Sequence, residues 1–384
     1  GLAVQDVAEL TGFPEMLDGR VKTLHPLVHG GLLGDRQSTD HRTQMEAAGI
    51  EGFDLLVVNL YEFEKTVTAP HTLAEAIESV DIGGPAMIRA ASKNFNNVTV
   101  VVDPSDYPTV LEHLRDGTVA DLRLELMAKA FRHTATYDAM IATYFSRLGP
   151  GKPFPTELPI GLKLIAEMRY GENPHQAGAL YANPLSAPGI AQAQQLSGKP
   201  LSYNNYLDAD AAWELVWDLA PGSCAIIKHG NPCGAASFAT PAESFRAARA
   251  ADTTSAFGGI AAFSAPLDLE TAEVVAAKGN FFEVILAPEI SPEAVAVFQN
   301  RAGWGPDCRL LVVAPPPNTP EIVVRSVRGG LLVQESDEEP ETRWQVVTDR
   351  APTAEEWDAL HFAWWVTKHV KSNAIVYVSA DDAG

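Results

Sequence analysis

The sequence predicts an α/β fold, because short apolar runs typical of strands alternate with segments of helical periodicity along most of the chain. Five runs are rich in β-branched residues and apolar on both faces, as expected for strands inside parallel or mixed sheets that helices cover. They are residues 55–60, 98–103, 225–229, 281–287 and 310–314. A length of 384 residues exceeds one ordinary core, so two or three domains are expected.

Two helix starts can be read from capping boxes. Thr72 is followed three residues later by Glu75, and Thr353 by Glu356, a pattern in which side chains satisfy the first free backbone N–H groups. Apolar residues recurring at helical spacing predict the longer helices. These are expected over residues 121–145, 241–251 and 353–370.

The domain boundary is predicted from a segment rich in proline and glycine that follows the first of these helices. Such residues block both a continued helix and a strand ladder. We therefore expect a first domain at residues 1–147, a linker at 148–160 and a second region at 161–384.

The net charge of −21 makes nucleic acid and membrane surfaces unexpected partners, because a strongly acidic protein repels phosphate backbones and anionic lipids. A small phosphorylated ligand stays open, since a few local cations and backbone N–H groups can hold it. The three cysteines form no CxxC pair, which argues against a disulfide framework and a zinc knuckle. With no apolar run long enough to span a bilayer and no signal sequence, a cytoplasmic location is expected.

A cluster of basic and hydroxyl residues lies near the start of the chain. Arg20, Lys22, Thr23 and His25 fall within six residues and could grip an anion, because alternate residues of an extended run point the same way. On these residues alone, a solvated loop with incidental charges is an equal alternative.

Further polar residues follow the first strand-like run. Asn59 and Tyr61 come at its carboxyl end, where open α/β sheets place ligands. Asp81 precedes a pair of glycines that begins at Gly83, and such a turn can aim N–H groups at a ligand, although it more often only reverses the chain. Lys93 lies beyond on a helical stretch, and either reaches the pocket of Asp81 or sits in water.

The second half contains its own candidates. Lys228 and His229 end an apolar run, a position that carries chemistry in α/β sheets, although His229 could equally be a hydrogen-bonded structural histidine. A Pro-Cys pair at 232–233 is similar to part of the zinc-deaminase signature, but Ala236 stands where a second cysteine would be needed. No metal is expected. The other candidates come from polar segments and are Arg169, Tyr170, Asp252, Ser255 and Asn373.

Longer sequence motifs occur in a fixed order along the chain. The first half carries DGRVKTLHP, NLY, DIGGPAMIRAASKN and AFRHTATYDAMIA. The second half carries RYGENPHQ, KPLSYNN, IIKHGNPCG, DTTSAFGG, RSVRGGLLVQ and VKSNAIVY, the last reaching a strand-like run at 374–378. In these motifs and their order the chain resembles the bifunctional purine-biosynthesis family that joins inosine monophosphate (IMP) cyclohydrolase to aminoimidazole carboxamide ribonucleotide (AICAR) transformylase. The resemblance implies a methylglyoxal-synthase-like N-terminal domain followed by a cytidine-deaminase-like, zinc-free transformylase region.

This resemblance implies formyl transfer from 10-formyltetrahydrofolate to AICAR, and then cyclisation of formyl-AICAR to IMP with loss of water. Both steps need proton removal and stabilisation of a developing oxyanion. The catalytic residues that it implies are Lys228, His229, Asn373, Asp81, Lys93, Tyr61 and Lys22. The substrate-binding residues that it implies are Arg20, Thr23, Asn59, Gly83, Arg169, Tyr170, Asp252 and Ser255.

Two parts of the family pattern are missing from this chain. No STGGT-type phosphate loop precedes Thr11, and no GQMSR-type or FFPF-type segment follows the run at 374–378. We therefore expect a chain truncated at both ends, with an inactive nucleotide-binding fragment as the alternative to the enzyme. The resemblance also implies a homodimer whose small-molecule partners are the nucleotides and folate.

Overall fold

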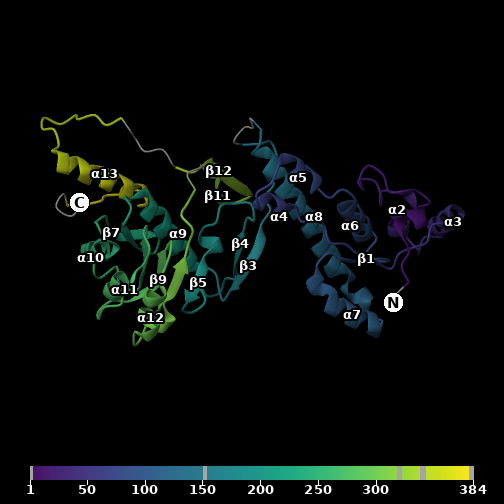
Figure 1. Ribbon diagram of the computed structural model, residues 1–384, viewed down its shortest axis with the longest axis horizontal. Coiled ribbons are helices and arrows are strands. Elements are labelled where there is room, and N and C mark those ends of the chain that lie inside the picture. The colour runs from purple at the N-terminus through teal and green to yellow at the C-terminus, as the bar shows by residue number, and fades with distance from the viewer. Residues whose placement is uncertain (1–2, 150–153, 318–321, 338–342, 380–384) are drawn as a thin grey trace. The chain divides into compact units, whose positions relative to one another are not determined.

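The computed structural model describes residues 3–149, 154–317, 322–337 and 343–379. It divides into two compact units, one of residues 1–162 with 183–185 and the other of residues 163–182 with 186–384 (Figure 1). Each of the five predicted strand runs overlaps a strand, and the α/β class is confirmed.

The first unit surrounds a two-stranded parallel sheet with helices. β1 (Leu55–Val57) pairs with β2 (Thr99–Val101), and Leu56 lies opposite Val100. The helices, in chain order, are α1 (Val7–Thr11), α2 (Pro26–Leu33), α3 (Thr39–Ala48), α4 (Phe63–Thr68), α5 (Leu73–Glu78), α6 (Gly83–Lys93), α7 (Tyr107–Asp116) and α8 (Arg123–Ser146).

The core of the first unit lies between β2 and three helices. Val100 belongs to the same buried cluster as Leu32 of α2, Ile88 of α6 and Ala130 of α8. α8 is 24 residues long and buries one face, as its periodicity predicts. The predicted capping box at Thr72 is also formed, and it starts α5.

β1 departs from its prediction of burial on both faces. Leu55 and Val57 are 36% and 46% exposed, and only Leu56 packs into the core. Among the described residues β2 is the only strand that pairs with β1, and Leu55 and Val57 belong to none of the described hydrophobic clusters.

The second unit is built on a six-stranded mixed sheet in the order β5-β10-β9-β8-β6-β7. The three central strands β8 (Gly259–Phe263), β9 (Phe282–Ala287) and β10 (Arg309–Val312) are parallel, and β5 (Gln194–Ser197), β6 (Cys224–Lys228) and β7 (Asn231–Ala236) pair antiparallel. Two hairpins stand outside this sheet, namely β3 (Lys163–Met168) with β4 (Gly178–Ala182), and β11 (Ile322–Val327) with β12 (Gly330–Glu335).

Successive side chains of the strands point to opposite faces of the sheet, and helices pack on each face, so this unit has three layers. Ile226 faces a core with α10 (Pro241–Ala251), α11 (Leu269–Val275) and α12 (Pro292–Asn300). Its neighbour Ile227 faces the other core, with α9 (Tyr203–Asp218) and α13 (Ala354–Lys368). Helices therefore cover both faces of the sheet, the arrangement that two-sided apolar strands predict.

The strand-like run at 374–378 is not a strand in the described structure. Val376 packs against the α9 side of the core, but Ile375 and Tyr377 are 78% and 93% exposed. The apolar pattern by itself cannot supply the neighbouring strand that a ladder requires, so this part of the prediction is wrong for the described chain.

Candidate functional site

Asp81 lies just before α6 and joins the first turn of this helix to the segment after β1. Its Oδ1 accepts a hydrogen bond from the Gly84 N–H at 2.7 Å, and its Oδ2 accepts one from the Tyr61 N–H at 3.3 Å. The N–H of Asp81 itself donates to the Tyr137 hydroxyl at 2.9 Å. These hydrogen bonds give Asp81 a structural role at the start of α6.

Thr23 meets the same turn. A Cβ on Gly83 would lie 2.5 Å from Thr23 Oγ1, so only glycine permits this approach. We name Thr23, Tyr61, Asp81 and Gly83 the α6 cluster. The structure therefore brings these four residues, predicted from separate motifs, to one helix end.

The basic residues beside the α6 cluster are paired with carboxylates. Arg20 Nη2 lies 2.7 Å from Glu78 Oε2, and Lys22 Nζ lies 2.8 Å from Glu15 Oε2. Hydrogen bonding to Glu15 and its charge raise the pKa of Lys22, and the nearby Tyr61 contributes in the same direction. An incoming anion would have to displace these exposed carboxylates.

Asn59 and Lys93 are not part of the α6 cluster. Asn59 Nδ2 donates to the Tyr107 hydroxyl at 3.2 Å. Lys93 is exposed at the last residue of α6, whereas Asp81 precedes its first residue. Because a helix rises about 1.5 Å per residue, Lys93 is roughly 15 Å from that turn. The two side chains therefore do not meet within this chain, and the catalytic role of Lys93 stays a prediction.

The second group of residues surrounds the turn between β6 and β7. His229 is exposed, with a left-handed backbone at φ 55° that is uncommon outside glycine. Its N–H donates to Asp208 Oδ2 at 3.0 Å, and the Gly230 N–H donates to Asp208 Oδ1 at 2.7 Å. One carboxylate on α9 thus holds the turn that presents the histidine.

Lys228 is half-buried beside this turn, and its ammonium donates to the Phe257 carbonyl at 2.7 Å. The loop containing Phe257 is organised by Asp252, which accepts hydrogen bonds from the Ser255 hydroxyl at 2.6 Å and the Ser255 N–H at 2.8 Å. These bonds lower the pKa of Asp252. Asp252 and Ser255 therefore shape the loop against which Lys228 rests.

Cys233 lies close enough to these charged groups for them to affect the pKa of its thiol. Burial raises the pKa of the Cys233 thiol, the Asp252 and Asp208 carboxylates raise it further, and the Lys228 ammonium opposes them. We name Asp208, Lys228, His229 and Asp252 the β6–β7 cluster.

The segment after α13 also reaches this turn. A Cβ on Gly230 would lie 3.2 Å from Lys371 Nζ, so this ammonium sits directly over the turn. Asn373 is exposed two residues further on, with its Oδ1 3.3 Å from the Ser372 hydroxyl. Asp218 of α9 anchors the segment through Lys368 Nζ at 2.8 Å and His369 Nε2 at 2.6 Å.

Arg169 and Tyr170 lie in a loop next to the start of α9. The Arg169 guanidinium stacks over the Tyr170 ring at 5.9 Å, and Asn204 Nδ2 donates to the Glu172 carbonyl at 3.3 Å. The loop is thus tied to the helix that carries Asp208, although no hydrogen bond or ion pair joins the Arg169 and Tyr170 side chains to the β6–β7 cluster among the described residues.

Asp208 is the residue that sequence reasoning missed. It occupies a helical series with Ala212 and Val216, both of which are fully buried. A carboxylate at position i of an otherwise apolar i, i+4, i+8 series needs a hydrogen-bond or ionic partner. This pattern is the signal in the sequence that could have identified Asp208.

Other features of the described residues lie apart from both clusters. A groove of about 520 Å³ runs along α13, lined by residues that include Arg350, Leu360 and Tyr377. Among the residues described, no group of three or more His, Cys, Asp or Glu side chains could hold a metal ion. None of the helices described is long and apolar enough to cross a membrane.

A family model described as "AICARFT/IMPCHase bienzyme" matches residues 91–383, and a model described as "MGS-like domain" matches residues 1–86. The chain belongs to the AICARFT/IMPCHase bienzyme family. Members of this bienzyme family are bifunctional AICAR formyltransferases and IMP cyclohydrolases of purine biosynthesis. The resemblance, the enzyme class and the methylglyoxal-synthase-like first region expected from the sequence are therefore confirmed.

Several curated relatives share one name. "Bifunctional purine biosynthesis protein PurH" from Sinorhizobium medicae is 49% identical over 98% of this chain and 70% of its own length. The proteins of that name from Desulfitobacterium hafniense and Deinococcus deserti are 48% and 46% identical, over 75% and 74% of their lengths. The match across both halves favours the bienzyme over an inactive nucleotide-binding fragment. A solved structure, "Crystal structure of ForH", is 39% identical and covers 39% of this chain at a TM-score of 0.35, too low to compare the folds.

Proposed function

We propose that the β6–β7 cluster transfers the formyl group of 10-formyltetrahydrofolate to AICAR, and that the α6 cluster closes formyl-AICAR to IMP. The observation that carries the proposal is that Lys228 and His229 stand at the accessible end of a strand whose other residues are buried. Such strand ends are where α/β sheets present reacting groups.

In the transfer, His229 accepts a proton from the 5-amino group of AICAR as this nitrogen attacks the formyl carbon, and it returns the proton to the folate nitrogen as the bond from that nitrogen to the formyl carbon breaks and tetrahydrofolate leaves. The Lys228 ammonium stabilises the negative oxygen that forms on that carbon. Lys228 is already held by the Phe257 carbonyl, so it is oriented before substrate arrives. Asn373 orients the formyl or imidazole group, and the neighbouring Lys371 adds positive charge over the turn.

The remaining residues of the second unit bind the nucleotide in this proposal. Arg169 and Tyr170 contact the phosphate and carboxamide of AICAR, and Asp252 and Ser255 line the nucleotide pocket. The mutual hydrogen bonds of Asp252 and Ser255 support a role in shaping the pocket rather than in proton transfer.

In the cyclisation, Asp81 accepts the proton lost by the attacking carboxamide nitrogen. Lys22 and Thr23 stabilise the developing oxyanion, Tyr61 relays a proton to the departing hydroxyl, and Arg20, Asn59 and Gly83 form the substrate grip. We also propose the catalytic role of Lys93 that the resemblance implies, although Lys93 lies at the other end of α6 from Asp81.

We further propose that residues 1–147 carry the cyclisation and residues 161–384 the transfer, joined by the linker at 148–160. We also propose that the chain forms a homodimer and that it is located in the cytoplasm. The β11–β12 hairpin supports self-association, since Val323, Val324 and Leu332 are 45%, 48% and 60% exposed. Sedimentation of the purified chain tests the dimer, and a single species of 41.2 kDa would contradict it.

The transfer is tested by Lys228→Gln, with Lys278→Gln as the matched control. Both changes remove one lysine charge from the second unit, but Lys278 is an exposed residue outside the β6–β7 cluster. With AICAR and 10-formyltetrahydrofolate supplied, we expect tetrahydrofolate release to fall by about 100-fold in Lys228→Gln, the usual scale for one oxyanion-stabilising group. Equal rates in the two variants would refute the role of Lys228.

A further inference from the structure

Asn94 ends α6 and holds the far end of α2. Its Nδ2 donates to the Leu32 carbonyl at 2.9 Å and to the Gly34 carbonyl at 3.0 Å. The side chain is only 8% exposed. A helix leaves its last carbonyls without intrahelical partners, so Asn94 satisfies the end of a helix other than its own.

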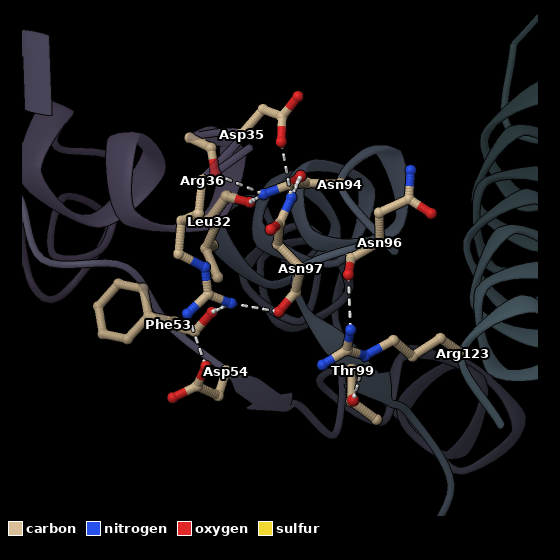
Figure 2. Close-up of polar contacts among 11 residues, drawn as sticks. Leu32, Asp35, Arg36, Phe53, Asp54, Asn94, Asn96, Asn97, Thr99 and Arg123 are labelled. Carbon is tan, nitrogen blue, oxygen red and sulfur yellow. Dashed lines mark hydrogen bonds and ion pairs between the residues drawn. The ribbon is translucent and has the colours of Figure 1, made fainter. Parts of the chain in front are cut away.

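Asn97 and Arg36 hold Asn94 in place (Figure 2). Asn97 Nδ2 donates to Asn94 Oδ1 at 2.8 Å and to Asp35 Oδ1 at 3.1 Å. The Arg36 guanidinium donates to the Asn97 carbonyl and pairs with Asp54 at 2.6 Å. Asn94 is therefore fixed from both sides of its amide, and the bonds leave it little freedom to follow a shift of α2.

α2 and α6 connect this network to the α6 cluster. Thr23, three residues before α2, touches Gly83 at the first residue of α6. At the other end, Asn94 contacts the last turn of α2. The two helices thus run in the same direction, and Leu32 and Ile88 pack them into one core.

We infer that Asn94 is a positioning residue for cyclisation, because it sets how far α2 lies along α6 and hence where Thr23 stands relative to Asp81. The inference rests on the function proposed above for the α6 cluster. Rigid helices transmit such a displacement along their axes, and small misplacements of reacting groups cost large factors in rate.

The test is Asn94→Asp, with Asn96→Asp as the matched control. Aspartate offers no N–H, so its carboxylate would face the two carbonyls that Asn94 now satisfies. Asn96 lies in the same loop with an exposed side chain, and its backbone carbonyl accepts a hydrogen bond from Arg123 at 2.6 Å. With formyl-AICAR as substrate, we expect kcat of Asn94→Asp to fall by about 10-fold or more while KM changes by less than about 2-fold.

Hydrogen exchange supplies a readout independent of activity. The N–H groups of Tyr61 and Gly84 are the donors to Asp81, and we expect both to exchange faster in Asn94→Asp than in Asn96→Asp. A purely local role would accelerate exchange only near residues 32–36 and 94–97. If Asn94→Asp does not fold, Asn94→Ser, which keeps one donor, should show the same pattern to a smaller extent.

Three outcomes decide the inference. A lower kcat with faster exchange at Gly84 supports it, whereas an unchanged kcat and unchanged exchange at Gly84 in a folded variant overturn it. If the unaltered chain does not cyclise formyl-AICAR, the proposed function fails, and the exchange at Gly84 still shows whether Asn94 positions the α6 cluster.

Discussion

Asp208 accepts hydrogen bonds from the main-chain N–H groups of His229 and Gly230, one on each carboxylate oxygen. This relationship fixes a non-glycine residue in the left-handed region, which costs of order 1–3 kcal/mol when surrounding structure does not support it. The strand alone would not present His229 in this way. The helix that packs on the sheet supplies the constraint.

Asp208→Asn should therefore weaken both the turn and the transfer. The amide keeps one acceptor oxygen, so one of the two N–H groups loses its partner, and we expect the free energy of unfolding to fall by about 1–2 kcal/mol. Tetrahydrofolate release should fall by at least about 10-fold as His229 loses its orientation. Urea unfolding and the transfer assay measure the two effects.

Glu273→Gln is the control for that change, because Glu273 is an exposed carboxylate on another helix of the same unit. A transfer rate in Asp208→Asn equal to that of Glu273→Gln would show that the turn does not need its carboxylate.

Gly83→Ala should impair cyclisation and leave formyl transfer intact. The new methyl group would lie 2.5 Å from Thr23 Oγ1, so either Thr23 or the first turn of α6 must move. We expect kcat with formyl-AICAR to drop by about 10-fold or more. Gly149→Ala places the same methyl group in open space and should be neutral. Equal cyclisation by both variants would remove Thr23 and Gly83 from the site.

The anchor of α13 should weaken in acid. Burial favours a higher pKa for Asp218, but hydrogen bonds from His369 and Lys368 outweigh it and hold the pKa below the ordinary 3.8. The stabilisation is therefore present above pH 3.8 and is lost as the pH falls through the lowered value. Unfolding of the chain and of Asp218→Asn between pH 3 and pH 6 measures this difference.

We expect the stability gap between the chain and Asp218→Asn to be constant at pH 5–6 and to shrink below pH 4. A gap that stays constant to pH 3 would mean that Asp218 is not the titrating anchor.

The local sequence pattern predicted helices and strands correctly where a neighbouring element packs against them. Ile226 and Ile227 alternate between two cores, and the boxes at Thr72 and Thr353 start helices as expected. The run around Tyr377 failed because a strand also needs a partner, which apolar pattern cannot specify.

The candidate sites were predictable only in part. Thr23, Asp81 and Gly83 meet as their motifs suggest, because each lies at the start of an element. Asp208 could not be found from a motif, since its role arises from the packing of α9 on the sheet. The resemblance implied a catalytic role for Lys93 together with Asp81, whereas the length of α6 places the two residues at opposite ends of this helix.

The most direct test is to supply His229→Ala with AICAR and 10-formyltetrahydrofolate, and separately with formyl-AICAR. The account predicts that tetrahydrofolate release is lost in the first assay while IMP forms from formyl-AICAR at the rate of the unaltered chain. Tetrahydrofolate release that survives the loss of the imidazole, in a variant that still cyclises, would contradict the placement of the transfer chemistry at the β6–β7 turn.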